Sequence, residues 1–249
     1  MKDPAGQNGS GRSSKRRRSP AESQRALVLA MMVLIVVILA AVATVIVYGM
    51  QVQKAPRTVG ERTLATAEAA VRDAPDKAQS WLSLAYAYVE IGRYSAASDA
   101  IARGRKVEDL PDFYIVDAYR AEKAGNVEEA IQLYEVAKKK AIEYRKAQDA
   151  KAAEAGARLT GANEQLVSAA LGKARLLVAQ RDYKSAVVEY DIALEQDPMM
   201  ADVLVERGAA KAKMGDLAGA RADYEEALRY VPGMPEALDG LARLEAGDK

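Results

Sequence analysis

The sequence predicts an all-α protein in which a single transmembrane helix precedes an α-solenoid, a stack of helix hairpins. Half of the 249 residues are hydrophobic but only 6% are aromatic, a composition that suits closely packed helices. Residues 26–48 carry no charge, as expected for a membrane-spanning helix. In the last third, residues 180–198 and 214–232 share one pattern at a spacing of 34 residues, and such a period indicates stacked helix hairpins.

Residues 1–24 are predicted to be a disordered cytoplasmic tail, because they are small, polar or charged and have little to bury. Residues 1–25 hold seven basic and two acidic residues, a net charge of +5, and the other 224 residues have a net charge of −4. The basic run at residues 15–18 is expected to attract anionic lipid headgroups. No nucleic-acid binding is expected, because neither aromatic residues nor a folded frame accompany the charge. Ser19 follows three arginines and is a hypothetical phosphorylation site, which mass spectrometry of the tail would test.

Residues 25–49 are predicted to be the transmembrane helix, since the uncharged run exceeds the roughly 20 residues needed to cross about 30 Å of hydrocarbon. The positive charge before it places the N-terminus in the cytoplasm of a bacterial-type cell, and the rest of the chain outside the plasma (inner) membrane. Two alternatives are an inverted topology and a signal peptide cleaved near residues 41–43, although the apolar run continues past that cut. The absence of cysteine excludes a lipoprotein.

Residues 50–75 are predicted to be a linker, over residues 51–60, and a membrane-proximal helix, over residues 58–73. This helix is interpreted as the second half of a degraded first hairpin that packs on the next one. Four hairpins follow, at about residues 78–109, 111–142, 167–198 and 201–232, and a capping helix at residues 235–246.

The first complete hairpin shows the pattern most clearly. Trp81, Leu84, Ala85 and Tyr88 precede a turn at Gly92, and small residues are expected where the two helices cross. Other hairpins depart from this pattern. Asp117 and Ala121 stand where a leucine and a tyrosine are expected, so the second hairpin is predicted to be looser. In the third hairpin Arg181 replaces the turn glycine, and Lys173 stands where an apolar residue is usual, which is predicted to weaken the first helix.

This pattern resembles the tetratricopeptide repeat, W-x2-L-G-x2-Y followed by A-x3-F and P, and the chain resembles membrane-anchored bacterial proteins of this type. The resemblance covers roughly residues 76–246 and implies a right-handed superhelix. It also implies that the first helices of successive hairpins line a concave groove that binds peptides. The groove residues it implies are Leu82, Tyr86, Val89, Ile115, Tyr119, Lys123, Leu171, Arg175, Val178, Val205 and Lys213. That lining favours a hydrophobic or amphipathic segment, although some of these residues could instead pack inside the protein.

One stretch breaks the period. Gly125 and Arg181 lie 56 residues apart, 22 more than one period, and the excess falls at about residues 143–166. This segment is rich in Ala, Lys and Glu, which favour helix. The simplest interpretation is that the two flanking helices are both longer and turn near residues 160–161. A disordered loop and a dedicated partner-binding arm are the alternatives.

The residue inventory predicts no enzyme, no cofactor and no metal site. The chain has neither histidine nor cysteine, the usual general base and thiolate nucleophile. Adjacent carboxylates such as Glu128 with Glu129, or Glu225 with Glu226, point about 100° apart on a helix and do not converge. The predicted function is a membrane-anchored scaffold or adaptor that binds polypeptide partners, as an accessory in protein secretion or envelope assembly. The alternative is a structural module that self-assembles as a homo-oligomer.

Overall fold

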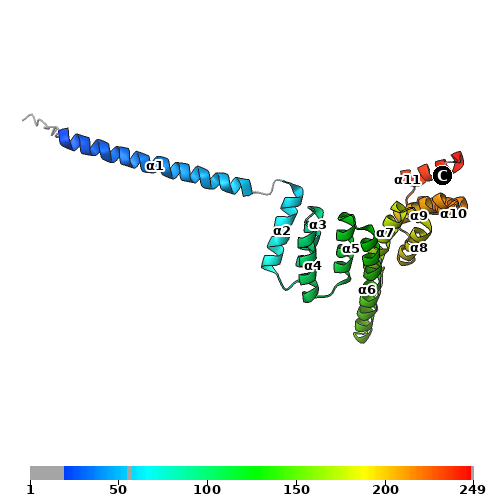
Figure 1. Ribbon diagram of the computed structural model, residues 1–249. Helices are drawn as coiled ribbons and strands as arrows, with labels where there is room; N and C mark the ends of the chain where they lie inside the picture. Colours follow the sequence, from blue (N-terminus) through cyan, green and yellow to red (C-terminus); the bar gives the residue numbers. More distant parts are fainter. Residues whose placement is uncertain (1–19, 55–57, 248–249) are drawn as a thin grey trace, which may run out of the picture. The chain divides into compact units, whose positions relative to one another are not determined.

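The computed structural model describes residues 20–54 and 58–247, and these residues form eleven α-helices (Figure 1). The chain divides into two units, residues 1–55 and 56–249, which are considered separately. The predicted all-helical class is confirmed for the described residues.

The first unit contains one helix, α1 (Pro20–Lys54). Its stretch Leu27–Val47 has a mean hydropathy of 3.1, none of it is buried, and within the described residues it is the one helix long and apolar enough to cross a membrane. Two boundaries differ from the prediction. Residues 20–24 are helical rather than disordered, and residues 51–54 of the predicted linker continue the helix. The basic run at residues 15–18 and Ser19 lie outside the described residues.

The second unit begins with α2 (Val59–Asp73), which starts at a reciprocal cap. The Glu61 amide donates to Thr58 Oγ1 and the Thr58 amide donates to Glu61 Oε2, both at 3.1 Å. This capping box satisfies two amides that would otherwise lack a partner. Leu64 and Ala67 are buried, and α2 packs against the next helix like the second half of a hairpin.

Four hairpins and a single helix follow in sequence. Their helices are α3 (Ala78–Glu90), α4 (Tyr94–Val107), α5 (Pro111–Lys123), α6 (Val127–Glu154), α7 (Glu164–Ala179), α8 (Tyr183–Gln196), α9 (Ala201–Met214), α10 (Leu217–Tyr230) and α11 (Pro235–Ala246). Each helix contacts the next one in order, which makes the second unit the predicted solenoid.

Small residues and tyrosines interlock wherever helices cross. Ala85 and Ala97 have no exposed surface, and Tyr134, Tyr190 and Tyr224 are buried at equivalent places in their hairpins. A Cβ on the Gly172 backbone would lie 2.4 Å from Cζ of Tyr134, so α7 approaches this ring more closely than any larger residue permits. The helices therefore pack at close range, as in other protein interiors.

The turns inside the hairpins share one backbone conformation. Gly92, Gly125 and Gly215 have positive φ angles of 75°, 83° and 86°, and Arg181 adopts the same region at 62°. Glycine enters this region without the steric cost that a side chain brings. The third hairpin thus keeps the turn at the expense of strain in Arg181.

Charged residues inside the stack pair with one another, which corrects the prediction that Lys173 weakens its helix. The Lys173 ammonium lies 2.8 Å from both Glu135 and Glu189, and Lys138 lies 2.7 Å from Glu189. One hairpin later, Arg207 lies 2.7 Å from both Asp191 and Asp223. The pairs of Lys173 and Arg207 join a first helix to its own second helix and to the preceding one, and the pair of Lys138 with Glu189 joins the second helices α6 and α8.

The sequence had suggested that two long helices share the extra 22 residues, but the structure shows otherwise. α6 has 28 residues, whereas α7 has 16 and starts at Glu164. Arg145 of α6 donates to the carbonyls of Gly161 and Ala162 at 3.2 and 3.3 Å, and Asn163 Nδ2 donates to Ala141 O at 3.0 Å. The connection therefore folds back along α6 and is held there.

Candidate protein-binding groove

The first helices of the hairpins, α3, α5, α7, α9 and α11, lie on the inner side of the stack. α3 contacts α5, α5 contacts α7, and α9 contacts α11, whereas in residues 58–247 no two second helices make a comparable contact. Helices that touch their counterparts lie on the inside of a curved stack, and those that spread apart lie on the outside. We call the exposed surface of the first helices the groove.

The eleven groove residues predicted from the sequence do not all face solvent. Leu82, Val89 and Ile115 are only 5%, 2% and 8% exposed and belong to the hydrophobic core, so their assignment as exposed lining was wrong. The residues that remain at the surface, in whole or in part, are Tyr86, Tyr119, Lys123, Leu171, Arg175, Val178, Val205 and Lys213.

At the α3 and α5 end, two tyrosines form the surface. The rings of Tyr86 and Tyr119 lie 6.2 Å apart at 48°, and Tyr86 is 38% exposed. The Tyr119 hydroxyl donates to Glu90 at 2.6 Å, and the Lys123 ammonium lies 5.1 Å from the centre of its ring. Burial raises the pKa of both phenols, and the charge of Asp112 adds to the rise for Tyr86. Both hydroxyls therefore stay protonated at neutral pH and can donate hydrogen bonds.

The middle of the groove is braced by an ion pair between α7 and α9. Arg175 donates to both carboxylate oxygens of Glu206, at 2.8 and 3.1 Å, and Tyr190 donates to the same carboxylate at 3.0 Å. The hydrogen bonds to Glu206 raise the pKa of Arg175 despite its partial burial. Two-pronged pairs of this kind hold their geometry well. Arg175 is thus engaged within the protein rather than free to bind a ligand.

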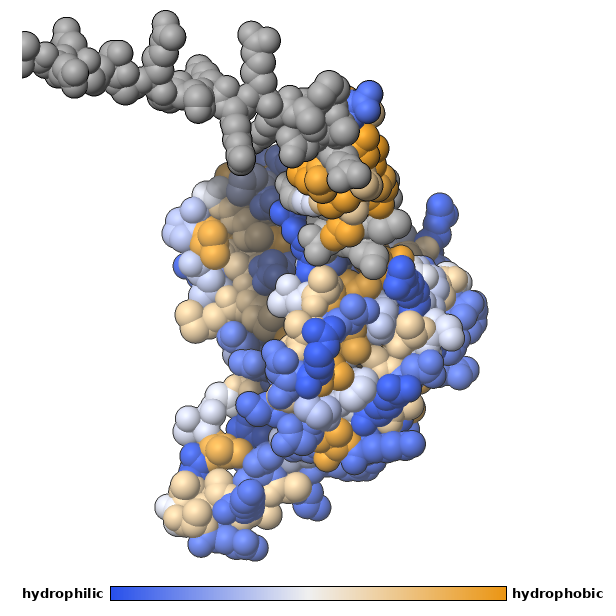
Figure 2. Space-filling model, turned by 90° about the vertical axis from the view of Figure 1, so that its left-hand side faces the viewer, coloured by the Kyte–Doolittle hydropathy of each residue, from blue (hydrophilic) through white to orange (hydrophobic). Residues whose placement is uncertain are grey.

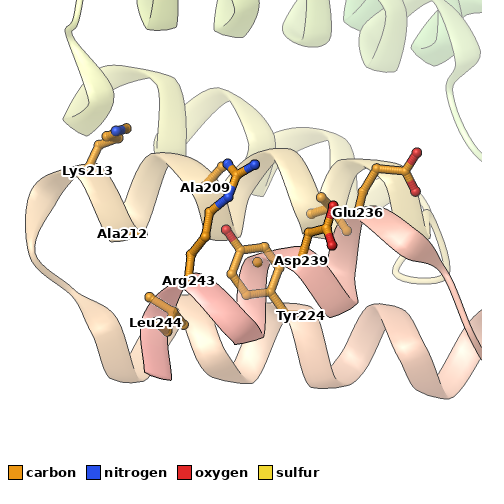
Figure 3. A pocket seen from close by; sticks show the side chains of 10 residues that line it. Ala209, Ala212, Lys213, Tyr224, Glu236, Asp239, Arg243 and Leu244 are labelled. Atoms are coloured by element: carbon orange, nitrogen blue, oxygen red, sulfur yellow. The ribbon is translucent and has the colours of Figure 1, made fainter. Parts of the chain in front are cut away.

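At the α11 end, the groove deepens into a cavity of about 520 Å³. Its floor is small and apolar, because Ala209 and Ala212 of α9 face Gly240 and Leu244 of α11 over the ring of Tyr224. In the view of Figure 3, Glu236 and Asp239 lie at one end and Lys213 at the other, with Arg243 above Tyr224. The cavity thus combines an apolar base with rim charges of both signs. That combination suits a polypeptide segment, which supplies apolar and charged groups together.

Sequence reasoning found Val205 and Lys213 of this cavity but missed Glu236, Asp239 and Arg243. These three residues lie on α11, which the sequence analysis interpreted only as a capping helix. The signal was present, because Leu238 and Ala242 continue the first-helix pattern at a spacing of 34 residues from Leu204 and Gly208. A helix in that register places its Asp239 and Arg243 on the groove.

Charged and polar residues cover much of the molecular surface in the view of Figure 2, and the hydrophobic residues visible there form separate areas. The groove residues at the surface are also mixed in character, since Lys123, Arg175 and Lys213 lie among tyrosine, leucine and valine residues.

Comparisons with known proteins agree with this architecture. Residues 62–111 and 171–235 match the tetratricopeptide repeat family model. The unmatched residues between them include the long α6 and its connection. A search of curated proteins finds no significant match to the chain.

Solved structures share the fold at low sequence identity. The crystal structure of BtubC from P. vanneervenii is 19% identical, with a TM-score of 0.59 over 77% of this chain and 86% of that one. A tetratricopeptide repeat protein from Parabacteroides merdae is 17% identical, with a TM-score of 0.51 over 68% of this chain and 59% of that one. The family match and the shared fold show that the helical stack is similar to tetratricopeptide repeat proteins, which bind protein or peptide partners.

Proposed function

We propose that this chain is a membrane-anchored scaffold whose tetratricopeptide stack binds a polypeptide segment in the groove, outside the plasma (inner) membrane. The observation that carries the proposal is the cavity between α9 and α11. It lies on the face that the first helices share, it has an apolar floor, and its rim offers Glu236 and Asp239 to basic groups and Arg243 to acidic ones. A segment with one large apolar side chain between charged neighbours fits this chemistry.

The proposed anchor is α1. Its 21 residues Leu27–Val47 are about 32 Å long at 1.5 Å per residue, which matches the thickness of a bilayer core. The one hydroxyl in this stretch, Thr44, donates to the Ala40 carbonyl at 2.8 Å, so its polar group is satisfied within the helix. The charge of +5 before the stretch favours a cytoplasmic N-terminus.

Anchoring would favour binding by keeping the groove close to the membrane. A tethered groove meets membrane-bound partners at a raised effective concentration without any additional contact. An accessory role in protein secretion or envelope assembly is the proposed setting, because both processes present polypeptide segments next to the membrane.

Filling the cavity tests the groove. A photoreactive residue at Val205 should crosslink the partner in living cells, and Ala209→Trp in the same chain should abolish the crosslink by occupying the floor. The matched control is Val188→Trp at a residue of α8 that is 54% exposed, which should change neither crosslinking nor stability. A partner captured equally well by the Ala209→Trp chain would show that binding occurs elsewhere.

Cysteine labelling tests the topology. Because the natural chain has no cysteine, only the introduced residue can react. A chain with Ser95→Cys, at an exposed residue of α4, should react with a membrane-impermeant maleimide in intact cells. Labelling only after lysis would place the stack in the cytosol. A mature protein whose mass lacks the residues before position 44 would show that α1 is a cleaved signal.

A further inference from the structure

The helix α2 is a second helix that has no first helix in residues 58–247. Ala67 and Pro75 are eight residues apart, like Tyr224 and Pro232, which fixes its register. In the complete hairpins, Ala97, Ala130, Ala186 and Ala220 have no exposed surface, because each first helix covers them. Their equivalent in α2, Thr63, is exposed. It lies in an open slot of about 500 Å³ between α2 and α3, whose other lining residues are Val59, Arg62, Thr66, Ala67, Ala70 and Ser83.

The helix α11 shows the complementary feature. In α9, Leu204 is 2% exposed and Gly208 is buried, since both lie under α10. Their equivalents in α11 are Leu238, which is 49% exposed, and Ala242, which is also exposed. α11 therefore presents to solvent the face that other first helices bury against their second helix.

We propose that α11 of one copy docks into the slot between α2 and α3 of a second copy and completes a hairpin across two chains. Contacts within the stack show how the residues would meet. In the first complete hairpin a Cβ on Gly104 would lie 2.8 Å from Cβ of Trp81, and the equivalent pair is Ala70 with Leu238. In the fourth hairpin a Cβ on Gly208 would lie 3.2 Å from Cβ of Asp223, and the equivalent pair is Thr66 with Ala242.

The charges also agree with this occupant. In the fourth hairpin, Arg207 of the first helix pairs with Asp223 of the second. At the two equivalent places the composite hairpin has Leu241 and Thr66, both uncharged. Lys211 also pairs with Asp223 in the fourth hairpin, and its equivalent in α11 is Glu245, a carboxylate opposite in charge to Arg62 of the slot. An apolar stripe of Leu238 and Leu241 then meets a slot lined by valine, alanine, threonine, serine and Arg62.

This contact joins different surfaces of the two copies, so it is heterologous and extends copies into a row rather than closing a pair. The groove stays open, because Asp239 and Arg243 lie on another face of α11, in the cavity. End-to-end association is therefore independent of peptide binding, and either can fail alone.

Disulfide trapping of the full-length chain in membranes tests the contact. Two single-cysteine chains, Thr66→Cys and Ala242→Cys, are mixed under mild oxidation. The 3.2 Å separation of their intrachain counterparts is close to the Cβ separation of about 3.5–4.5 Å in disulfides. We expect a disulfide dimer from the mixture, and a ladder of multimers from a chain that carries both cysteines. Ser95→Cys mixed with Ala242→Cys is the control and should give only background.

A second variant separates specific docking from chance collision. Leu238→Glu in the Ala242→Cys chain places a carboxylate in the slot and should reduce the dimer to the control level, while circular dichroism shows unchanged helicity. The proposal is overturned if the Thr66 and Ala242 cysteines crosslink no more than the control pair, or if Leu238→Glu leaves the dimer intact. It is also overturned if Thr66→Cys traps a different protein in place of a second copy.

Discussion

Replacing Glu189 with alanine should destabilise the helical stack, because two ammonium groups converge on this buried carboxylate. Glu189 is 5% exposed, and Lys138 donates to its two oxygens at 2.7 and 2.9 Å. Lys173 lies 2.8 Å from the same carboxylate. Removal of Glu189 leaves two positive charges with Glu135 as their remaining acidic partner, and Lys138 is only 7% exposed.

The cost follows from the burial. Breaking one side of a buried ion pair typically costs about 3–5 kcal/mol. Glu135 stays 2.9 Å from Lys138 and 2.8 Å from Lys173, so the lower figure of about 3 kcal/mol applies. In a unit of this size that loss lowers Tm by about 6–12 °C. The double substitution Glu189→Leu with Lys138→Met removes the most buried pair, keeps apolar volume and leaves Lys173 with Glu135, so its stability should lie within about 1 kcal/mol of the natural unit.

Urea unfolding of residues 56–249, followed by circular dichroism, measures these differences, since this part of the chain is a compact unit. Glu143→Ala is the matched control. It breaks an equally short pair with Lys140, at 2.9 Å, whose side chains are 66% and 37% exposed, and such surface pairs contribute at most about 1 kcal/mol. The reasoning fails if Glu189→Ala costs no more than Glu143→Ala, or if the double variant is as unstable as the single one.

Three further predictions use the same assay. Arg181→Gly should stabilise the unit by about 1 kcal/mol, because glycine relieves the positive φ of 62°; a loss of stability would contradict this. Gly172→Ala should cost about 1–3 kcal/mol, since the new methyl group overlaps the Tyr134 ring, and an unchanged midpoint would refute that clash. Burial by itself would raise the pKa of Glu135, but hydrogen bonds from Lys173 and Lys138 outweigh it and lower the pKa below its ordinary value of 4.5. Glu135 thus contributes stability above about pH 4.5 that is lost as the pH falls through the lower pKa of the folded state. Glu135→Gln should therefore flatten the loss of stability on acidification, and an unchanged slope would exclude this role.

The repeated architecture could be predicted from the sequence because the pattern is local. Each hairpin carries its small residues, tyrosines and turn glycine within about 34 residues, so one unit suffices to identify the helices and their order. The helix at α2 was found in the same way, from an apolar face that ends before Pro75. The positive φ of Arg181 could also be expected, since it stands where other hairpins have glycine.

Burial within the groove could not be predicted, because it depends on neighbouring helices. Leu82 and Val89 stand at first-helix positions that the resemblance assigns to the groove, yet both belong to a core cluster that includes Leu64 of α2 and Phe113 of α5. A single repeat does not show how closely its neighbours approach. The division of the 22 extra residues was hidden for a similar reason, since the contacts of Arg145 that fold the connection back reach residues 16 and 17 positions away.

The ion pairs explain how a stack with charged interior positions keeps its groove in shape. Lys173 and Arg207 occupy equivalent places, and each bridges an acidic residue of its own second helix and one of the preceding second helix. A displaced hairpin would leave these buried charges unpaired, at a cost that a purely apolar interior does not impose. Between α7 and α9, Arg175 donates to both carboxylate oxygens of Glu206. Charged side chains thus connect the two helices there, whereas the cavity at α11 is lined by the small residues Ala209 and Ala212. An ion pair across the middle and an open cavity at one end would let the proposed scaffold hold a polypeptide segment without enclosing it.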